Sequence, residues 1–262
     1  MSFSDDVISD CLTIRQSKTG YRFGLDALLL ATDLPPFERI NRHVIEFGPA
    51  HGPVCLSIAS RLADLSVVGV EVQDDLLMLL QHNIEHNHFG SSVVEAMLGN
   101  VKQIKTLLPS HQASLVLFNP PYFPLKKRRV APNPQRAIAR HEVEGTLHDF
   151  IMAAQYVLHP KGWCKFVIPP WRLMDAMSSW TQTDFGCVSI RTIHANPQTE
   201  AYLLEVVLRR GARTDMMMPP ALYIRDKDGF YTDEVCQRLA HAACAEPHPD
   251  AMSRIHSRSQ AN

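Results

Sequence analysis

The sequence predicts an α/β protein with a mostly parallel, seven-stranded sheet, helices on both faces and an antiparallel last strand. Short apolar runs alternate with helical stretches along most of the chain, which is typical of parallel sheets. A loop with two glycines, residues 48–52, follows the first apolar run and opens a helix, as in a nucleotide-binding βαβ unit. We expect residues 1–40 to form a lead-in and a lid over a ligand, residues 41–244 the main domain, and residues 245–262 a disordered tail.

Composition narrows the class of protein. The chain has 262 residues, of which 45% are hydrophobic and 20% charged, as in a globular protein with a sizeable core. A formal net charge of −1 gives no global basic field, so a nucleic-acid partner must meet a local patch. The six cysteines are scattered, and neither they nor His82 and His86 suggest a metal site. With no signal peptide or membrane-spanning run, we expect a cytoplasmic protein.

The loop at residues 20–26 precedes an expected helix at residues 27–31 and contains two glycines, two aromatic residues and an arginine. One interpretation makes Tyr21 and Phe23 core anchors. The other makes the loop part of a ligand lid, with Arg22 facing a carboxylate or phosphate. Composition and spacing leave both open.

Each of the next expected strands is followed by a residue or loop suited to a nucleotide. These strands span residues 43–47, 66–70 and 93–98. Glu71 comes about 20 positions after the glycine loop, where a ribose diol is held. Asn100 follows the third strand, from which it can hydrogen-bond an adenine edge. Because the carboxyl ends of parallel strands share one edge of a sheet, we expect these groups to lie together.

The fourth expected strand, residues 114–118, ends in the stiff turn Asn119-Pro120-Pro121-Tyr122. The Asn119 side-chain oxygen and the Pro120 carbonyl suit the two N–H donors of a planar amine, and Tyr122 suits stacking on its ring. The amine nitrogen would then point at an electrophile, with catalysis mostly by positioning. The alternative is a rigid loop that caps the strand, with Tyr122 packed in the core.

A run of cations follows the turn and is either a solvated face or a grip on phosphates. It consists of Lys126, Lys127, Arg128 and Arg129, with Arg140 further on. Beyond it we expect helices at residues 146–158, 170–180 and 232–243, and strands at residues 163–168, 188–193 and 202–209. The last two strands are close in sequence, so we expect them to pair antiparallel.

Four stretches of the chain resemble the bacterial valine-tRNA adenine-N6 methyltransferase family, which has a Rossmann-like, class I methyltransferase fold. They are residues 20–27, 119–123, 140–142 and 222–232. The resemblance implies S-adenosylmethionine as cofactor and RNA, most specifically tRNA near the anticodon, as substrate. It implies that residues 119–122 hold the target base. It also implies a cofactor site made of Arg22, Phe23, Gly24, Asp26, Glu46, Gly48, Ala50, Gly52, Glu71, Asn100 and Asn119.

The cofactor loop departs from the family pattern. Ala50 stands where the middle glycine is usual, and its Cβ is costly if that position needs a positive φ. Pro49 removes a backbone donor, and Asn100 replaces a usual aspartate. These departures leave RNA binding without activity open as one alternative. A second alternative is methylation of another amine (a guanine N2 in rRNA, a release-factor glutamine or a DNA adenine), because the resemblance implies that the same motif at residues 119–122 serves those substrates as well.

Overall fold

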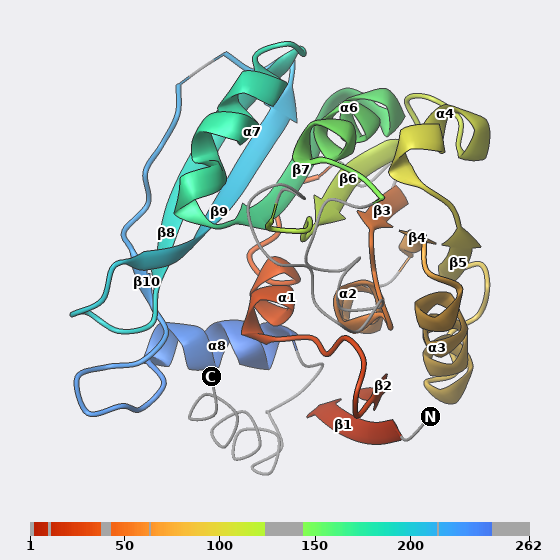
Figure 1. Cartoon of the computed structure of the whole chain (residues 1–262), viewed down its shortest axis with the longest axis horizontal. Coiled ribbons are helices and arrows are strands. Elements are labelled where there is room, and N and C mark those ends of the chain that lie inside the picture. The colour runs from red at the N-terminus through yellow and green to blue at the C-terminus, as the bar shows by residue number, and fades with distance from the viewer. Residues whose placement is uncertain are drawn as a thin grey trace.

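An eight-stranded sheet forms the centre of the protein in the computed structural model (Figure 1). The structure describes residues 3–9, 12–37, 43–62, 64–123, 144–213 and 215–242. The strand order is β10-β8-β9-β7-β6-β3-β4-β5. The strands are β3 (His43–Phe47), β4 (Ser66–Glu71), β5 (Val94–Leu98), β6 (Ala113–Phe118), β7 (Leu158–Ile168), β8 (Phe185–His194), β9 (Ala201–Arg210) and β10 (Leu222–Tyr223).

The pairing pattern confirms the predicted fold class, with one added strand. β5, β4, β3, β6 and β7 pair parallel, and β9 is antiparallel to both of its neighbours, β7 and β8. The count is eight rather than seven because β10 pairs parallel with the end of β8 through Leu222 and Tyr223. Two residues are too few to show a strand periodicity in the sequence.

Helices cover both faces of this sheet (Figure 1). One core cluster joins the sheet to α1 (Leu25–Leu30), α2 (Pro53–Arg61), α3 (Asp74–His86) and α8 (Asp233–Ala242). The other joins it to α4 (Ile104–Leu107), α6 (Leu147–Val157) and α7 (Leu173–Trp180). In β6, Leu115 and Leu117 belong to the first cluster and Val116 and Phe118 to the second. A strand buried on both sides reads as one continuous apolar run, which is why the sequence located it.

A separate hairpin precedes the sheet, where the sequence indicated only a lead-in. It consists of β1 (Phe3–Ser9) and β2 (Leu12–Ser17), paired antiparallel. Two asparagines hydrogen-bond the free edge of β2, Asn83 within α3 and Asn87 at the C-cap of that helix. Asn87 exchanges bonds of 2.9 and 2.8 Å with the Thr13 backbone, and Asn83 two bonds of 2.9 Å with that of Arg15. Asn83 also donates to the His51 carbonyl at 2.7 Å. The hairpin edge is thereby covered and tied to the glycine loop.

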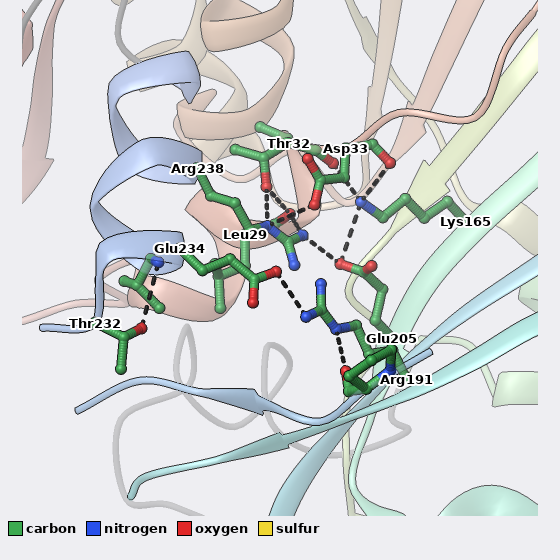
Figure 2. A network of polar contacts seen from close by, with 12 residues as sticks. Leu29, Thr32, Asp33, Lys165, Arg191, Glu205, Thr232, Glu234 and Arg238 are labelled. Carbon is green, nitrogen blue, oxygen red and sulfur yellow. Dashed lines mark hydrogen bonds and ion pairs between the residues drawn. The ribbon is translucent and has the colours of Figure 1, made fainter. Parts of the chain in front are cut away.

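A buried ionic network holds α1 and α8 against the sheet (Figure 2). Lys165 of β7 is fully buried, and its Nζ lies 3.2 Å from Glu205 Oε2 of β9 and donates to the Thr32 carbonyl beyond α1. Arg238 of α8 lies 2.7 Å from the same Glu205 oxygen and donates to the Thr32 hydroxyl and the Leu29 carbonyl. Desolvation tends to raise the pKa of Glu205, but the two cations outweigh it and hold that pKa below its ordinary value.

The later elements lie close to their predicted positions. β7 starts five residues earlier than predicted, and the predicted helix at residues 170–180 begins as a short 3₁₀ helix, η2 (Pro170–Arg172), before α7. A second 3₁₀ helix, η1 (Val101–Gln103), precedes α4. The tail at residues 245–262 lies outside the described residues, and the predicted domain boundaries stay a prediction.

Candidate active site

A pocket opens at the carboxyl ends of four neighbouring strands, β6, β3, β4 and β5. One residue from each strand end lines it: Asn119, Gly48, Glu71 and Asn100, respectively. Twelve further residues complete the lining: Tyr21, Ala50, Val70, Val72, Gln73, Leu76, Gly99, Val101, Pro121, Glu144, Gly145 and Phe150. The strand ends that the sequence singled out thus meet around one space.

The loop after β3 has left-handed backbone at every second residue. The φ angles are +70° at Gly48, +54° at Ala50 and +96° at Gly52. Ala50 therefore occupies a conformation that costs a residue with a Cβ about 1–2 kcal/mol. Its side chain is buried against Leu76 and Leu79 of α3, and its N–H donates to Glu71 at 3.0 Å. Ala50 thus adopts a positive φ, the conformation that a glycine at this position would adopt without strain.

Glu71 holds a fixed carboxylate at the end of β4. Its Oε1 accepts the N–H groups of Val72 at 3.0 Å and Gln73 at 2.9 Å, and its Oε2 accepts that of Ala50 at 3.0 Å. Burial raises the pKa of Glu71, and these backbone bonds oppose the rise. A carboxylate has about four lone-pair sites, so this one retains acceptor capacity toward the pocket.

Both the oxygen and the nitrogen of the Asn100 side-chain amide are hydrogen-bonded within the protein. Its oxygen accepts the Lys102 N–H at 2.9 Å and caps η1, and its Nδ2 donates to Glu144 Oε2 at 3.1 Å. Glu144 also lines the pocket, and among the described residues nothing donates to its second oxygen. The acceptor at this strand end is therefore a carboxylate that comes from the segment before α6. Sequence reasoning missed Glu144 because no periodicity or motif marked it.

The turn after β6 is organised by Asp26 at the start of α1. Asp26 Oδ2 accepts Asn119 Nδ2 at 2.9 Å and the Tyr122 hydroxyl at 3.0 Å. With Nδ2 committed, the Asn119 amide keeps its oxygen as the acceptor available to the pocket that it lines. Burial, together with the Asp26 charge, raises the pKa of Tyr122 well above its ordinary value, so this phenol stays protonated. Arg172 adds a 3.0 Å bond to the Tyr122 carbonyl.

Several predicted residues support the pocket without lining it. The Arg22 guanidinium bonds the hairpin, at 3.1 Å from Ser4 Oγ and 3.2 Å from Asp6 Oδ2. Phe23 lies with its ring centroid 5.5 Å from that of His51, and Gly24 precedes α1 as its N-cap. Those not in the lining also include Asp26, Glu46, Gly52, Pro120 and Tyr122. Lys126, Lys127, Arg128, Arg129 and Arg140 lie outside the described residues.

Two buried titratable groups belong to this region: Glu46 on β3, just before the glycine loop, and His51 within the loop. Glu46 accepts the Cys55 N–H at 2.9 Å, and its burial raises its pKa to about 8. His51 is fully buried with neither ring nitrogen hydrogen-bonded, and this burial, with the Arg22 charge, lowers its pKa to about 3. At neutral pH the loop therefore packs around an uncharged imidazole and a largely protonated carboxyl.

Two other kinds of feature are absent from the described part of the chain. No three His, Cys, Asp or Glu side chains there are grouped to hold a metal ion. No helix among those residues combines the length and hydropathy needed to cross a bilayer.

The fold is that of class I methyltransferases. A predicted O-methyltransferase from Agrobacterium tumefaciens superposes with a TM-score of 0.68 at 19% identity, over 86% of this chain and 99% of that one. TrmN from Thermus thermophilus superposes with a TM-score of 0.51 at 18% identity, over 71% of this chain and 48% of that one.

Relatives found by sequence similarity share one more specific name. The tRNA1(Val) (adenine(37)-N6)-methyltransferase of Porphyromonas gingivalis is 27% identical over an alignment of 237 residues, gaps included, that covers 84% of this chain and 92% of the relative. The protein of the same name from Aeromonas hydrophila is 24% identical over 228 residues, 86% and 91% of the two chains. No family model matches the chain. The chain is thus a homologue of proteins named as tRNA adenine-N6 methyltransferases.

Proposed function

We propose that the protein is an S-adenosylmethionine-dependent N-methyltransferase that methylates N6 of an adenine in RNA, with tRNA as the first substrate to test. The observation that carries this proposal is the orientation of the Asn119 amide. The Asn119 Nδ2 donates a hydrogen bond to Asp26 at 2.9 Å, so the side-chain oxygen of Asn119, which lines the pocket, is left as an acceptor. An exocyclic amine needs acceptors, and the Pro120 carbonyl is the second one within this turn.

The pocket chemistry fits the cofactor. Glu71 offers a carboxylate for a ribose diol at the end of β4, and Glu144 one for the amine of the adenine ring at the end of β5. Phe150, Val101 and Pro121 supply apolar walls for a base. When bound, S-adenosylmethionine supplies an electrophilic methyl group.

The turn acts on the substrate by positioning. Asn119 Oδ1 and the Pro120 carbonyl accept the two N–H groups of the target amine and aim its nitrogen. As the nitrogen gains positive charge, these same hydrogen bonds strengthen, so preorganised acceptors lower the barrier without a strong base. Tyr122 is held by Asp26 through its hydroxyl and by Arg172 through its carbonyl. Its ring lies outside the pocket lining, and we assign it to stacking on the target base next to the amine. The amine proton passes to water after transfer.

Methyl transfer from radiolabelled S-adenosylmethionine to separate pools of tRNA, rRNA and release factor tests the proposal. We expect label in tRNA, recovered as N6-methyladenosine after digestion. Asn119→Ala should lose turnover while still binding S-adenosylhomocysteine in a calorimetric titration. Label in rRNA guanine or in a glutamine would replace the substrate assignment, and an Asn119→Ala enzyme as active as the wild type would overturn the role of the turn.

A further inference from the structure

An aromatic pair lies on the surface beside the Asn-Pro-Pro-Tyr turn. Phe123 directly follows the turn, and Trp171 belongs to η2. Their ring centroids are 5.8 Å apart and their planes 17° apart, so the rings are stacked. Trp171 is nevertheless 48% exposed. In proteins that bind single-stranded nucleic acids, exposed aromatic rings of this kind serve as stacking surfaces for unpaired bases.

The platform is rigidly connected to the candidate active site. Arg172, which follows Trp171, is buried and donates from Nη1 to the Tyr122 carbonyl at 3.0 Å. Its guanidinium carbon also lies 5.7 Å from the centre of the Trp171 ring. Because this arrangement ends at the turn itself, Trp171 lies beside the part of the chain where we place the target amine, and an extended ligand seated at Asn119 has neighbouring groups that can reach its ring.

The size and chemistry of the surface favour a single flat ring as occupant. The exposed apolar side chains that continue from Trp171 along α7 are Met174 and Met177. A stable protein partner buries about 800 Å² on each side, more than these three side chains offer. Unpaired RNA bases, in contrast, stack singly on exposed aromatic rings.

We propose that Trp171, backed by Phe123, is a stacking platform for a nucleobase next to the methylated adenine in an unpaired RNA segment. This inference rests on the proposed function and adds a contact that selects the RNA context of the target. Trp171 is a binding residue in this scheme, remote from the methyl group.

The test uses the full chain and an RNA hairpin whose unpaired loop carries the target adenine. Trp171→Ala should raise KM for this RNA about 5- to 150-fold, the range for losing one base–aromatic stack. Its kcat at saturating RNA and its affinity for S-adenosylhomocysteine should stay near those of the wild type, which also shows that the variant is folded. Trp171→Phe should retain most of the affinity. Met174→Ala, one helical turn away and 72% exposed, is the matched control and should change KM less than twofold.

Two further measurements locate the stacked base. RNA should quench the tryptophan fluorescence of the wild type and of Trp163→Phe, whose substitution lies in the middle of β7, but not of Trp171→Phe. Hairpins with an abasic site on either side of the adenine should each be compared in wild type and Trp171→Ala. On the side where the base stacks on Trp171, the abasic site should weaken RNA binding by the wild type but should not weaken binding by Trp171→Ala any further.

The results of these experiments distinguish a failure of the proposed methyltransferase function from a failure of the proposed stacking platform. If the wild type methylates no RNA, the proposed function fails and the platform fails with it. If it methylates RNA and Trp171→Ala leaves KM and quenching unchanged, only the platform is wrong. Loss of methylation of a release factor in Trp171→Ala, with RNA unaffected, would assign the surface to a protein instead.

Discussion

Replacing Asp26 with asparagine removes the charge on which two side chains of the turn converge. Asn119 Nδ2 and the Tyr122 hydroxyl both donate to Asp26 Oδ2, at 2.9 and 3.0 Å. A hydrogen bond to a charged group contributes about 1.5–3 kcal/mol. Without that charge the Asn119 amide can turn over, and it would then present a donor to a substrate amine that needs an acceptor.

We expect the Asp26→Asn substitution to lower kcat and to leave cofactor affinity nearly unchanged. If one such bond is lost in the transition state, kcat for RNA methylation should fall about 10- to 150-fold in Asp26→Asn. Affinity for S-adenosylhomocysteine should change less than about threefold, because Asp26 does not line the pocket. Tyr122→Phe, which removes the other donor and leaves Asn119 bound to Asp26, is the matched control and should lose less activity.

Steady-state methylation with RNA and calorimetric titration with S-adenosylhomocysteine measure the two quantities. An Asp26→Asn enzyme with unchanged kcat would refute the positioning argument. If the affinity for S-adenosylhomocysteine fell in parallel with kcat, Asp26 would contact the cofactor, as the sequence resemblance implies.

Three further substitutions test other parts of the structure. Glu144→Gln should weaken S-adenosylhomocysteine binding about tenfold in calorimetric titrations. It should also reduce the preference of the protein for S-adenosylhomocysteine over the analogue in which inosine replaces adenosine. If wild type and variant bound S-adenosylhomocysteine with equal affinity, Glu144 would be excluded from the adenine subsite. Ala50→Gly should raise the melting temperature by about 2–4 °C, because glycine accepts φ of +54° without strain; a lower value would mean that the buried methyl outweighs the strain. Glu205→Gln should destabilise the fold by about 3–5 kcal/mol in guanidinium titrations, since it leaves two buried cations without their shared anion. Asp5→Asn, which breaks an exposed ion pair, should change stability by less than about 1 kcal/mol and serves as its control.

The parallel half of the fold was readable because its strands are buried on both faces. Residues 113–118 are all buried, and such a strand is apolar throughout, whatever helices pack on it. The convergence of Gly48, Glu71, Asn100 and Asn119 followed from the same logic, since parallel strands end at one edge. The topology rule needed no knowledge of side-chain contacts.

Contacts between distant segments were not readable in this way. Asp26 meets Asn119 across 93 positions of the chain, and Glu144 meets Asn100 across 44. Neither pair has a spacing that a helix or a hairpin would impose, so no local pattern predicts it. The buried Lys165 escaped notice for a related reason: a lysine within a strand reads as solvent-facing unless its anion, Glu205 on another strand, is known to face it.

The departures in the cofactor loop have structural counterparts that bear on whether the site is intact. Ala50 adopts the left-handed backbone that a glycine would adopt, and its N–H remains directed at Glu71. Asn100 no longer offers a carboxylate, yet its amide holds the carboxylate of Glu144 at the same strand end. A chain that had lost the need for a cofactor would gain nothing from a strained alanine at 7% exposure or from a carboxylate fixed beside the pocket. Ala50 and Glu144 both line the pocket at the ends of the four strands, which is where a strained backbone and a fixed carboxylate would serve a ligand.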